Sequence, residues 1–154
     1  MYTRKVLIFD MDGCLCHNDF PPNFNIKDIS VQEARQICQH SVPYQKAVQI
    51  LGILYLSFKI IILTGREDFL RRVTVDWLKK HKFAYHKLIT MKHGWTVFDE
   101  YVNYKIENIK RIRPILVVDD FQPVLDTVNN MGISTYRIEV EEDWNLNKIL
   151  GKVL

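Results

Sequence analysis

Four aspartates of the chain stand where apolar runs end. Asp10 and Asp12 close the first such run, and Asp119 and Asp120 close another one more than a hundred positions later. Carboxylates gathered in one crevice repel one another, so such a set is costly unless a hard cation lies among them, and all-oxygen ligation suits Mg²⁺. Because Mg²⁺ usually takes only one or two protein carboxylates, at least one acid remains for covalent or proton-transfer chemistry.

A second polar group follows the apolar run at 59–63. Thr64 offers a hydroxyl, Gly65 permits close approach of the backbone, and Arg66 offers positive charge. Lys105 is a further cation. Phosphoryl transfer depends mostly on positioning and on neutralising the charge of the equatorial oxygens. If the fold brings these residues to the aspartates, they predict a phosphoryl-transfer site.

Strands and helices alternate along the chain. Apolar runs rich in branched and aromatic residues predict about five strands, at residues 5–11, 59–63, 87–90, 114–118 and 133–138. Helical spacing and end residues predict helices that begin near Val31, Ser41, Asp68, Asn103 and Pro123. This alternation implies an α/β fold, a three-layer Rossmann-like parallel sheet with helices on both faces. Ligands of such sheets bind at the carboxyl ends of the strands, where the polar residues stand.

Composition limits the class of protein further. The 154 residues are 47% hydrophobic and 25% charged, which is ordinary globular usage and predicts a single domain over residues 1–154. Charged residues interrupt the longest apolar stretches, so we expect no membrane span, and the short run before Asp10 predicts a cytoplasmic protein without a secretory signal. Three cysteines, an odd number, indicate reduced thiols. A formal net charge of +3 is compatible with an anionic substrate.

Four segments in order resemble the motifs of the haloacid dehalogenase (HAD) superfamily of phosphohydrolases. They are the sequences FDMDGCL at 9–15, ILTGR at 62–66, Lys105, and LVVDD at 116–120. The run at 101–138 also resembles the 3′-phosphatase domain of phage polynucleotide kinase. The resemblance covers nearly the whole chain and implies a HAD-like fold with a small cap-type insert at about residues 16–40.

The resemblance implies a role for each motif residue. Asp10 would be the nucleophile that becomes an aspartyl phosphate. Asp12 would protonate the leaving oxygen and then deprotonate the attacking water; dehalogenases of the superfamily lack this second acid. Lys105 would neutralise charge on the nucleophile and the phosphate. It is preferred to Lys92 and Lys110 because it would lie in the first turn of the helix that leads to the fourth strand.

Phosphate contacts and a metal site complete the implied assignment. The phosphoryl group would be bound by Thr64, whose hydroxyl bonds its oxygens, by Gly65, and by Arg66 at the mouth of the site. The Mg²⁺ ligands would be Asp119, Asp10, the main-chain carbonyl of Asp12 and Asp120, the last as a ligand or as support for one. Cys14 stands where the motif usually has Thr, a difference that we expect to cost little.

Other sites fit the residues less well. Cys14, Cys16 and His17 suggest zinc, yet only Cys38 and scattered histidines remain to complete a ligand set. A cysteine-phosphatase loop needs an arginine six positions after the cysteine, and none stands there. The glycines form neither a P-loop nor a dinucleotide-binding pattern, so no kinase half is indicated.

The substrate class follows from openness and charge. A short insert leaves the site open, which suits a polymer end, and the chain carries a basic cluster at Arg66, Arg71, Arg72, Lys79, Lys80, Lys82, Lys87 and Lys92, with Trp95 and Phe98 nearby. Such a cluster tracks a nucleic-acid backbone or forms a solvated face. We expect a 3′-phosphorylated nucleic-acid end as substrate. The alternatives are a mononucleotide or general small-molecule phosphatase and an inactive HAD-fold binding module. A homo-oligomer would supply a cap from a neighbouring copy.

Overall fold

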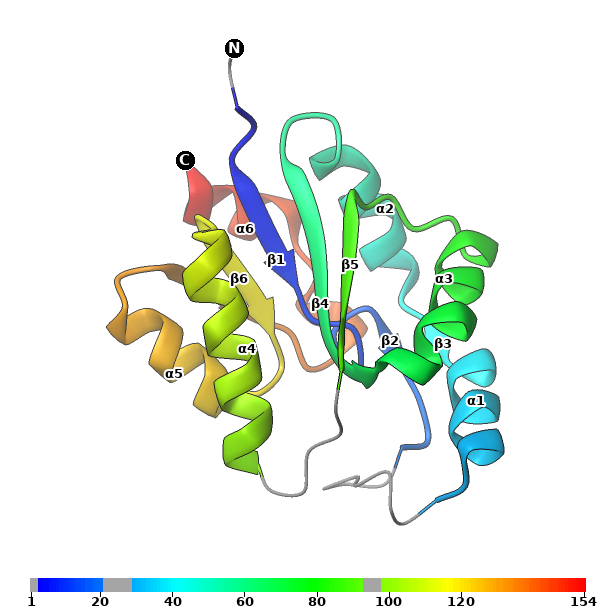
Figure 1. The fold of residues 1–154 in the computed structure, drawn as a ribbon. Helices are drawn as coiled ribbons and strands as arrows, with labels where there is room; N and C mark the ends of the chain where they lie inside the picture. Colours follow the sequence, from blue (N-terminus) through cyan, green and yellow to red (C-terminus); the bar gives the residue numbers. More distant parts are fainter. Residues whose placement is uncertain (1–2, 21–28, 93–97) are drawn as a thin grey trace.

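The computed structural model describes residues 3–20, 29–92 and 98–154 (Figure 1). Its centre is a five-stranded parallel sheet in the order β5-β4-β1-β6-β7. The strands are β1 (Val6–Phe9), β4 (Lys59–Glu67), β5 (Lys87–Met91), β6 (Leu116–Asp119) and β7 (Ser134–Arg137). The α-helices of the described residues are α1 (Val31–His40), α2 (Gln45–Leu54), α3 (Arg71–Lys80), α4 (Phe98–Ile112), α5 (Gln122–Asn130) and α6 (Leu146–Val153). The predicted α/β sheet and its five strands are confirmed.

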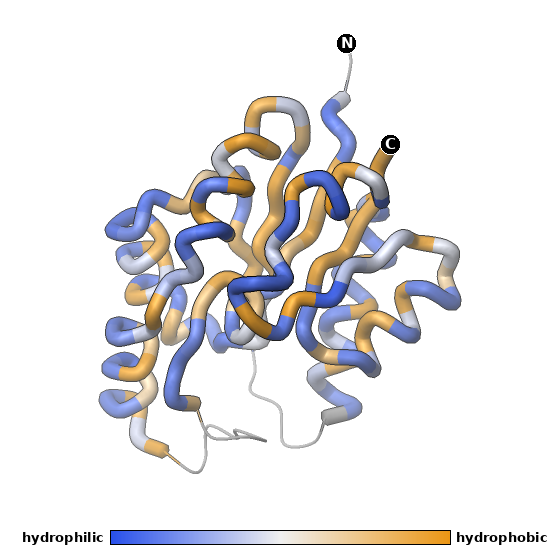
Figure 2. The backbone as a smooth tube through the Cα atoms, turned by 180° about the vertical axis from the view of Figure 1, so that it is seen from behind, coloured by the Kyte–Doolittle hydropathy of each residue, from blue (hydrophilic) through white to orange (hydrophobic). Residues whose placement is uncertain are grey.

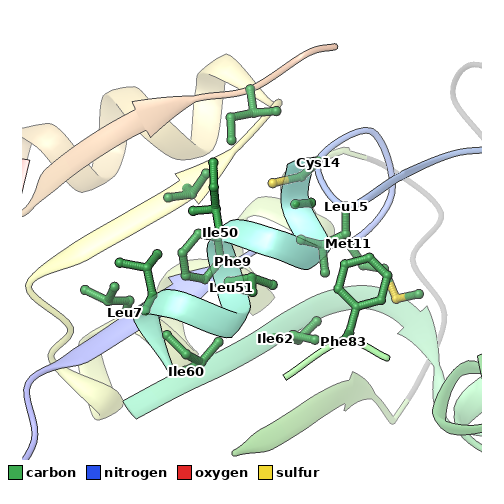
Figure 3. Close-up of a cluster of buried hydrophobic side chains, with 14 of the residues drawn as sticks. Leu7, Phe9, Met11, Cys14, Leu15, Ile50, Leu51, Ile60, Ile62 and Phe83 are labelled. Atoms are coloured by element: carbon green, nitrogen blue, oxygen red, sulfur yellow. The ribbon is translucent and has the colours of Figure 1, made fainter. Parts of the chain in front are cut away.

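Helices cover both faces of the sheet because successive strand residues point to opposite sides. Leu7 and Phe9 of β1 lie in one hydrophobic cluster with residues of α2, α3 and α6, whereas Ile8 lies in another with residues of α4 and α5. Figure 3 shows the first cluster, where Ile50 and Leu51 of α2 lie over β1 and β4. Burial on both faces explains the apolar runs of the central strands β1, β4 and β6, where the tube at the middle of the molecule is mostly orange in Figure 2.

The sheet has its switch point next to β1. From this central strand the chain forms β4 and β5 on one side and later β6 and β7 on the other. The carboxyl ends of β1 and β6 adjoin, since the Asp10 N–H donates to Val118 O at 2.9 Å. Ligands of open α/β sheets bind at this kind of crevice. The fold therefore brings Asp10 close to Asp119 although the sequence separates them widely.

The C-terminal segment, for which the sequence pattern predicts no element, packs under the first motif. The ring of Trp144 stacks on Phe9 with centroids 5.7 Å apart, and its Nε1–H donates to Cys14 O at 2.8 Å. α6 follows and buries Ile149 in the same cluster. This segment therefore supports the turn that carries the first two aspartates.

Two predicted helix starts are wrong. Ser41 ends α1 rather than beginning α2, because its hydroxyl donates to Ile37 O at 3.0 Å. The chain then pairs β3 (Val42–Pro43) with β2 (Cys16–His17) in a small antiparallel sheet before α2 begins. Asn103 does not cap a helix either; it lies inside α4, which begins five residues earlier at Phe98.

The segment predicted as a cap-type insert is described only in part, because residues 21–28 lie outside the described residues. α1 begins at a capping box, in which Ser30 Oγ accepts from Glu33 N at 3.1 Å and Glu33 accepts from Ser30 N at 2.8 Å. The helix packs on α3 through Ala34 and Cys38. Among the described residues, no helix is long and apolar enough to cross a bilayer.

Candidate active site

Three aspartates converge at the switch point of the sheet. Asp10 follows β1, Asp119 ends β6 and Asp120 comes next. One carboxylate oxygen from each lies within 4.8 Å of the others, and Asp10 and Asp119 are buried. The structure thus brings together three of the four aspartates that the sequence singles out, in an arrangement with the oxygen donors that a divalent cation needs.

Lys105 reaches this cluster from the middle of α4, not from the predicted first turn. Its Nζ donates to Asp10 Oδ1 at 2.6 Å and to Asp119 Oδ2 at 2.9 Å. The side chain is buried, and Nζ lies 5.4 Å from the ring centre of Tyr101, one turn earlier on the helix. The lysine therefore ties the two strand ends together and supplies one positive charge against three carboxylates.

The cluster carries more negative than positive charge. Burial raises the pKa of Asp10 well above its usual value, and Asp119 raises it further, although Lys105 opposes both. Burial and Asp119 also raise the pKa of Asp120 to about 7. Burial alone would lower the pKa of Lys105, but Asp10 and Asp119 outweigh it and raise that pKa. A divalent cation would relieve this imbalance.

A glycine turn lets Asp120 approach the first motif. Gly13 has φ +80°, and a Cβ at this position would overlap Asp120 Oδ2. The next residue, Cys14, turns its side chain into the hydrophobic cluster beside Leu15 (Figure 3). Burial and the charge of Asp10 raise the pKa of its thiol well above the usual value. Cys14 is thus a core residue, while the absence of a side chain at Gly13 leaves room for the carboxylate of Asp120.

The carboxylate of Asp12 is held by hydrogen bonds from the second motif and from Asn18. It accepts from Arg66 Nη2 at 2.6 Å, from Arg66 Nε at 3.0 Å and from Asn18 Nδ2 at 2.5 Å. Its side chain is 31% exposed, whereas that of Arg66 is 2% exposed. Among the described residues, the carboxylate of Asp12 is not part of the cluster formed by the other three aspartates. The contact of its main-chain carbonyl with Mg²⁺ stays a prediction.

Arg66 is buried rather than placed at the open mouth of the site. Besides Asp12, its guanidinium donates to Thr74 Oγ1 of α3 at 3.1 Å and to Ser41 Oγ after α1 at 3.5 Å. Burial alone would lower the pKa of Arg66, but the charge and hydrogen bonds of Asp12 outweigh it and raise the pKa above its usual value. No spacing in the sequence marks Ser41 or Thr74 as partners of this arginine.

Thr64 and Gly65 lie in an irregular part of β4. The register between β4 and β5 shifts after Leu63, so this strand runs further than the apolar run predicts. Thr64 is buried, and its Oγ1 accepts from Arg66 N at 3.1 Å. A Cβ at Gly65 would overlap the ring of Tyr101, so glycine permits close packing of β4 on α4 here. The sequence did not mark Tyr101.

The residues of the predicted basic cluster differ in their contacts. Arg71 donates to Leu88 O at 3.0 Å and to Thr90 Oγ1 at 3.3 Å, while Arg72 and Lys80 are exposed on α3. Trp77 of the same helix is buried in the hydrophobic cluster that contains Leu7 and Phe9. Exposed positions are also found for Lys79, Lys82, Lys87 and Lys92. Trp95 lies outside the described residues, and the side chain of Phe98 is not described.

The cysteines do not form a metal site with other described residues. The one group of potential ligands found among residues 3–20, 29–92 and 98–154 consists of the three aspartates. Cys14, Cys16 and Cys38 are buried and not disulfide-bonded. Burial raises the pKa of Cys38 to about 11, which disfavours the thiolate that zinc would require.

A known protein family matches most of the chain. The family described as PITM 1-3, LNS2 domain matches residues 7–119, a span that holds every motif residue of the predicted site except Asp120. No curated protein matches the sequence.

Solved structures resemble the fold. A chain of the Pnkp1/Rnl/Hen1 complex is 19% identical with a TM-score of 0.69, covering 88% of this chain and 46% of that one. A chain of the Pnkp1/Rnl/Hen1 RNA repair complex is 18% identical with a TM-score of 0.68, and the match covers 88% of this chain and 42% of that one. This chain therefore spans less than half the length of either.

Two further structures are similar over nearly their whole length. A HAD-superfamily hydrolase of Geobacter sulfurreducens PCA is 12% identical with a TM-score of 0.54, covering 92% of this chain and 97% of that one. A HAD-like family hydrolase of Porphyromonas gingivalis is 11% identical with a TM-score of 0.56, and the match covers 96% of this chain and 98% of that one. The fold is therefore HAD-like.

Proposed function

The chain belongs to the LNS2 domain family, and we propose that it is a phosphomonoester hydrolase that acts through an aspartyl phosphate on Asp10 with Mg²⁺ as cofactor. One observation carries the proposal. The buried carboxylate of Asp10 contacts the buried ammonium of Lys105 and lies beside two further aspartates at the switch point of a HAD-like sheet. Nucleophilic carboxylates of this kind form covalent intermediates that divide one difficult step into two easier ones.

The residues fit Mg²⁺. All three clustered side chains offer oxygen ligands, and burial together with the charge of Asp119 raises the pKa of Asp10 and of Asp120. We assign Asp10 and Asp119 as ligands, with the main-chain carbonyl of Asp12 as a third and Asp120 as a ligand or its support. When bound, the ion would neutralise charge on the carboxylates and on the phosphoryl oxygens.

The proposed reaction uses Asp10 as the nucleophile and Asp12 as the acid and base. A carboxylate oxygen of Asp10 attacks phosphorus, the bond from phosphorus to the leaving oxygen breaks, and the carboxyl group of Asp12 gives that oxygen its proton. Asp12 then takes a proton from a water whose oxygen attacks phosphorus, and the bond to Asp10 breaks. Lys105 holds Asp10 throughout. Thr64 uses a lone pair for the Arg66 N–H, so its hydroxyl proton is available to a phosphoryl oxygen.

We propose a 3′-phosphorylated nucleic-acid end as the substrate. In support, the fold resembles chains of an RNA repair complex, and exposed cations follow the second motif along α3. α1, which lies in the inserted segment, packs on α3, and the short length of that segment supports a site open to a polymer end. The cytoplasmic location and the homo-oligomer stay predictions.

The substrate proposal is tested with matched oligonucleotides that carry a phosphate at the 3′ or the 5′ end, alongside nucleoside monophosphates. We expect Mg²⁺-dependent phosphate release that is fastest from the 3′ end. Asp10→Asn should abolish it, whereas Asp126→Asn, an exposed aspartate on α5, should leave it unchanged. Release from small esters alone would replace the substrate by a mononucleotide or similar molecule. Release from nothing, by folded protein, would favour the binding module.

A further inference from the structure

A groove of about 680 Å³ lies between α1 and α3. Its lining is contributed by α1, by α3 and by the 3₁₀ turn at Asp68–Leu70 that precedes α3. The lining residues are Arg35, Gln39, His40, Phe69, Arg72, Val73, Asp76, Trp77 and Lys80. The groove has no part in the proposed chemistry, and the three aspartates of the active site are not among its lining residues.

The groove is positively charged along its rim. Arg35, Arg72 and Lys80 are exposed, and Asp76 is the carboxylate that lies among them. None of the ion pairs found within the described residues uses these three cations. Their charges are therefore available to a ligand that carries several negative charges.

The walls of the groove connect to the active site. Phe69 follows three residues after Arg66, at the end of β4 that carries the second motif. Arg66 itself donates to Thr74 of α3 and to Ser41, directly after α1, while it holds Asp12. The groove residue Phe69 therefore lies close in sequence to the second motif, and α1 and α3, which line the groove, are joined to the active site by Arg66.

We propose that this groove binds the single-stranded nucleic acid that precedes the 3′-phosphate, an inference that rests on the proposed function. Arg35, Arg72 and Lys80 contact backbone phosphates, and the half-buried ring of Phe69 offers a surface on which a base stacks. Asp76 repels the strand. The groove thus gives the enzyme its preference for a polymer end over a mononucleotide.

The test measures binding of a 12-nucleotide single strand with a 3′-hydroxyl by fluorescence anisotropy. The groove variant combines Arg35→Gln, Arg72→Gln and Lys80→Gln, and the control variant combines Lys110→Gln, Lys148→Gln and Lys152→Gln, exposed lysines of α4 and α6. Because each lost phosphate contact removes about 0.7 from the slope of log affinity against log salt, we expect the groove variant to lose about 2 in slope and at least roughly tenfold in affinity. The control variant should bind like the wild type.

The variant Asp76→Asn should bind the single strand more tightly, which a folding defect would not cause. Removal of the carboxylate should tighten binding of the single strand about two- to threefold at low salt. The same variants are then compared on 3′-phosphorylated strands of 2 and 12 nucleotides. The wild type should prefer the longer strand in kcat/KM, and the groove variant should lose that preference while it still hydrolyses the shorter strand.

The outcomes separate the groove from the proposed function. Hydrolysis of nucleoside monophosphates alone by the wild type would contradict the substrate proposal. Hydrolysis of 3′-phosphorylated strands, with equal binding by the groove and control variants, would contradict the groove and leave the function intact. Equal competition by polyglutamate of matched charge would also overturn the proposal, because it would indicate a surface for any polyanion.

Discussion

The carboxylate of Asp12 lies 2.6 Å from the buried guanidinium of Arg66, which stands 54 residues further along the chain. Arg66 makes hydrogen bonds from both Nε and Nη2 to this carboxylate, so its orientation is fixed by a fork of donors. The residue proposed for proton transfer is therefore held by the second motif. In our account Arg66 acts through Asp12, as a positioning residue, rather than by contact with the phosphate.

Replacement of this arginine should reduce turnover more than substrate affinity. For Arg66→Gln we expect kcat to fall roughly 10²-fold with little change in KM, because Asp12 loses its orientation. Loss of one partner from the buried pair should also lower the free energy of unfolding by about 2–3 kcal/mol, somewhat less than for a fully buried pair because Asp12 is partly exposed. Steady-state kinetics and denaturant unfolding measure the two effects.

A double variant separates positioning from folding. In Arg66→Gln/Asp12→Asn the unpaired charge is gone, so stability should return in part while activity stays lost. If Arg66→Gln instead raised KM with kcat unchanged, Arg66 would be a direct phosphate ligand, as the sequence pattern predicts.

Gly13→Ala should weaken metal binding. Its φ of +80° is costly for alanine, by about 1–2 kcal/mol, and the new Cβ would displace Asp120. Gly132 provides the matched control, since its φ is +77° and a Cβ there meets no atom within 4 Å. Both variants should lose the stability that the positive φ costs, and Gly13→Ala should lose more because of the overlap with Asp120. Only Gly13→Ala should lose Mg²⁺ affinity in calorimetric titration. Equal Mg²⁺ affinity in the two variants would rule out the proposed role of Asp120.

Metal-free protein should lose stability as the pH rises. The pKa of Asp120 is raised to about 7 by burial and by Asp119, so the folded state holds this proton more tightly than the unfolded chain does. This contribution to stability is complete below about pH 4 and is lost by about pH 7, since the unfolded state releases the proton first. The unfolding free energy of the wild type relative to Asp120→Asn should therefore fall over that range. Saturating Mg²⁺ should abolish the fall, and a pH-independent difference without metal would contradict it.

Lys105→Met should separate metal binding from turnover. Methionine matches the apolar stem of the lysine but lacks the ammonium that contacts Asp10 and Asp119. We expect phosphate release to fall by roughly 10²–10³-fold, because neutralisation of the phosphoryl charge is lost. Mg²⁺ should still bind, because its carboxylate ligands remain. Loss of Mg²⁺ binding together with activity would instead place Lys105 in support of the metal site.

Local pattern was sufficient to predict the strands and the aspartates at their ends. The apolar runs before Asp10 and Asp119 report burial on both faces of a sheet, which is a property of neighbouring residues in the chain. Parallel topology then predicts that their ends meet, and the structure brings Asp10, Asp119 and Asp120 within 4.8 Å.

Local sequence patterns did not predict the contacts between residues that lie far apart in the chain. Serine is a residue type that often begins a helix, but the hydroxyl of Ser41 donates to Ile37 O of α1. The same oxygen accepts a hydrogen bond from Arg66. The burial of Arg66 depends on Thr74 and Asp12, which no periodicity connects. A register shift in β4 places Thr64 further into the strand than an apolar run predicts. These features depend on packing between elements rather than on local sequence.

The most direct measurement is detection of a covalent phosphoryl group on Asp10. A strand with a radiolabelled 3′-phosphate is mixed with excess enzyme and Mg²⁺, quenched in acid within milliseconds to seconds, and the protein is separated and digested. We predict that labelled protein appears before free phosphate, that hydroxylamine removes the label, and that Asp10→Asn carries none. Phosphate release by Asp10→Asn at the wild-type rate would show that Asp10 is not the nucleophile.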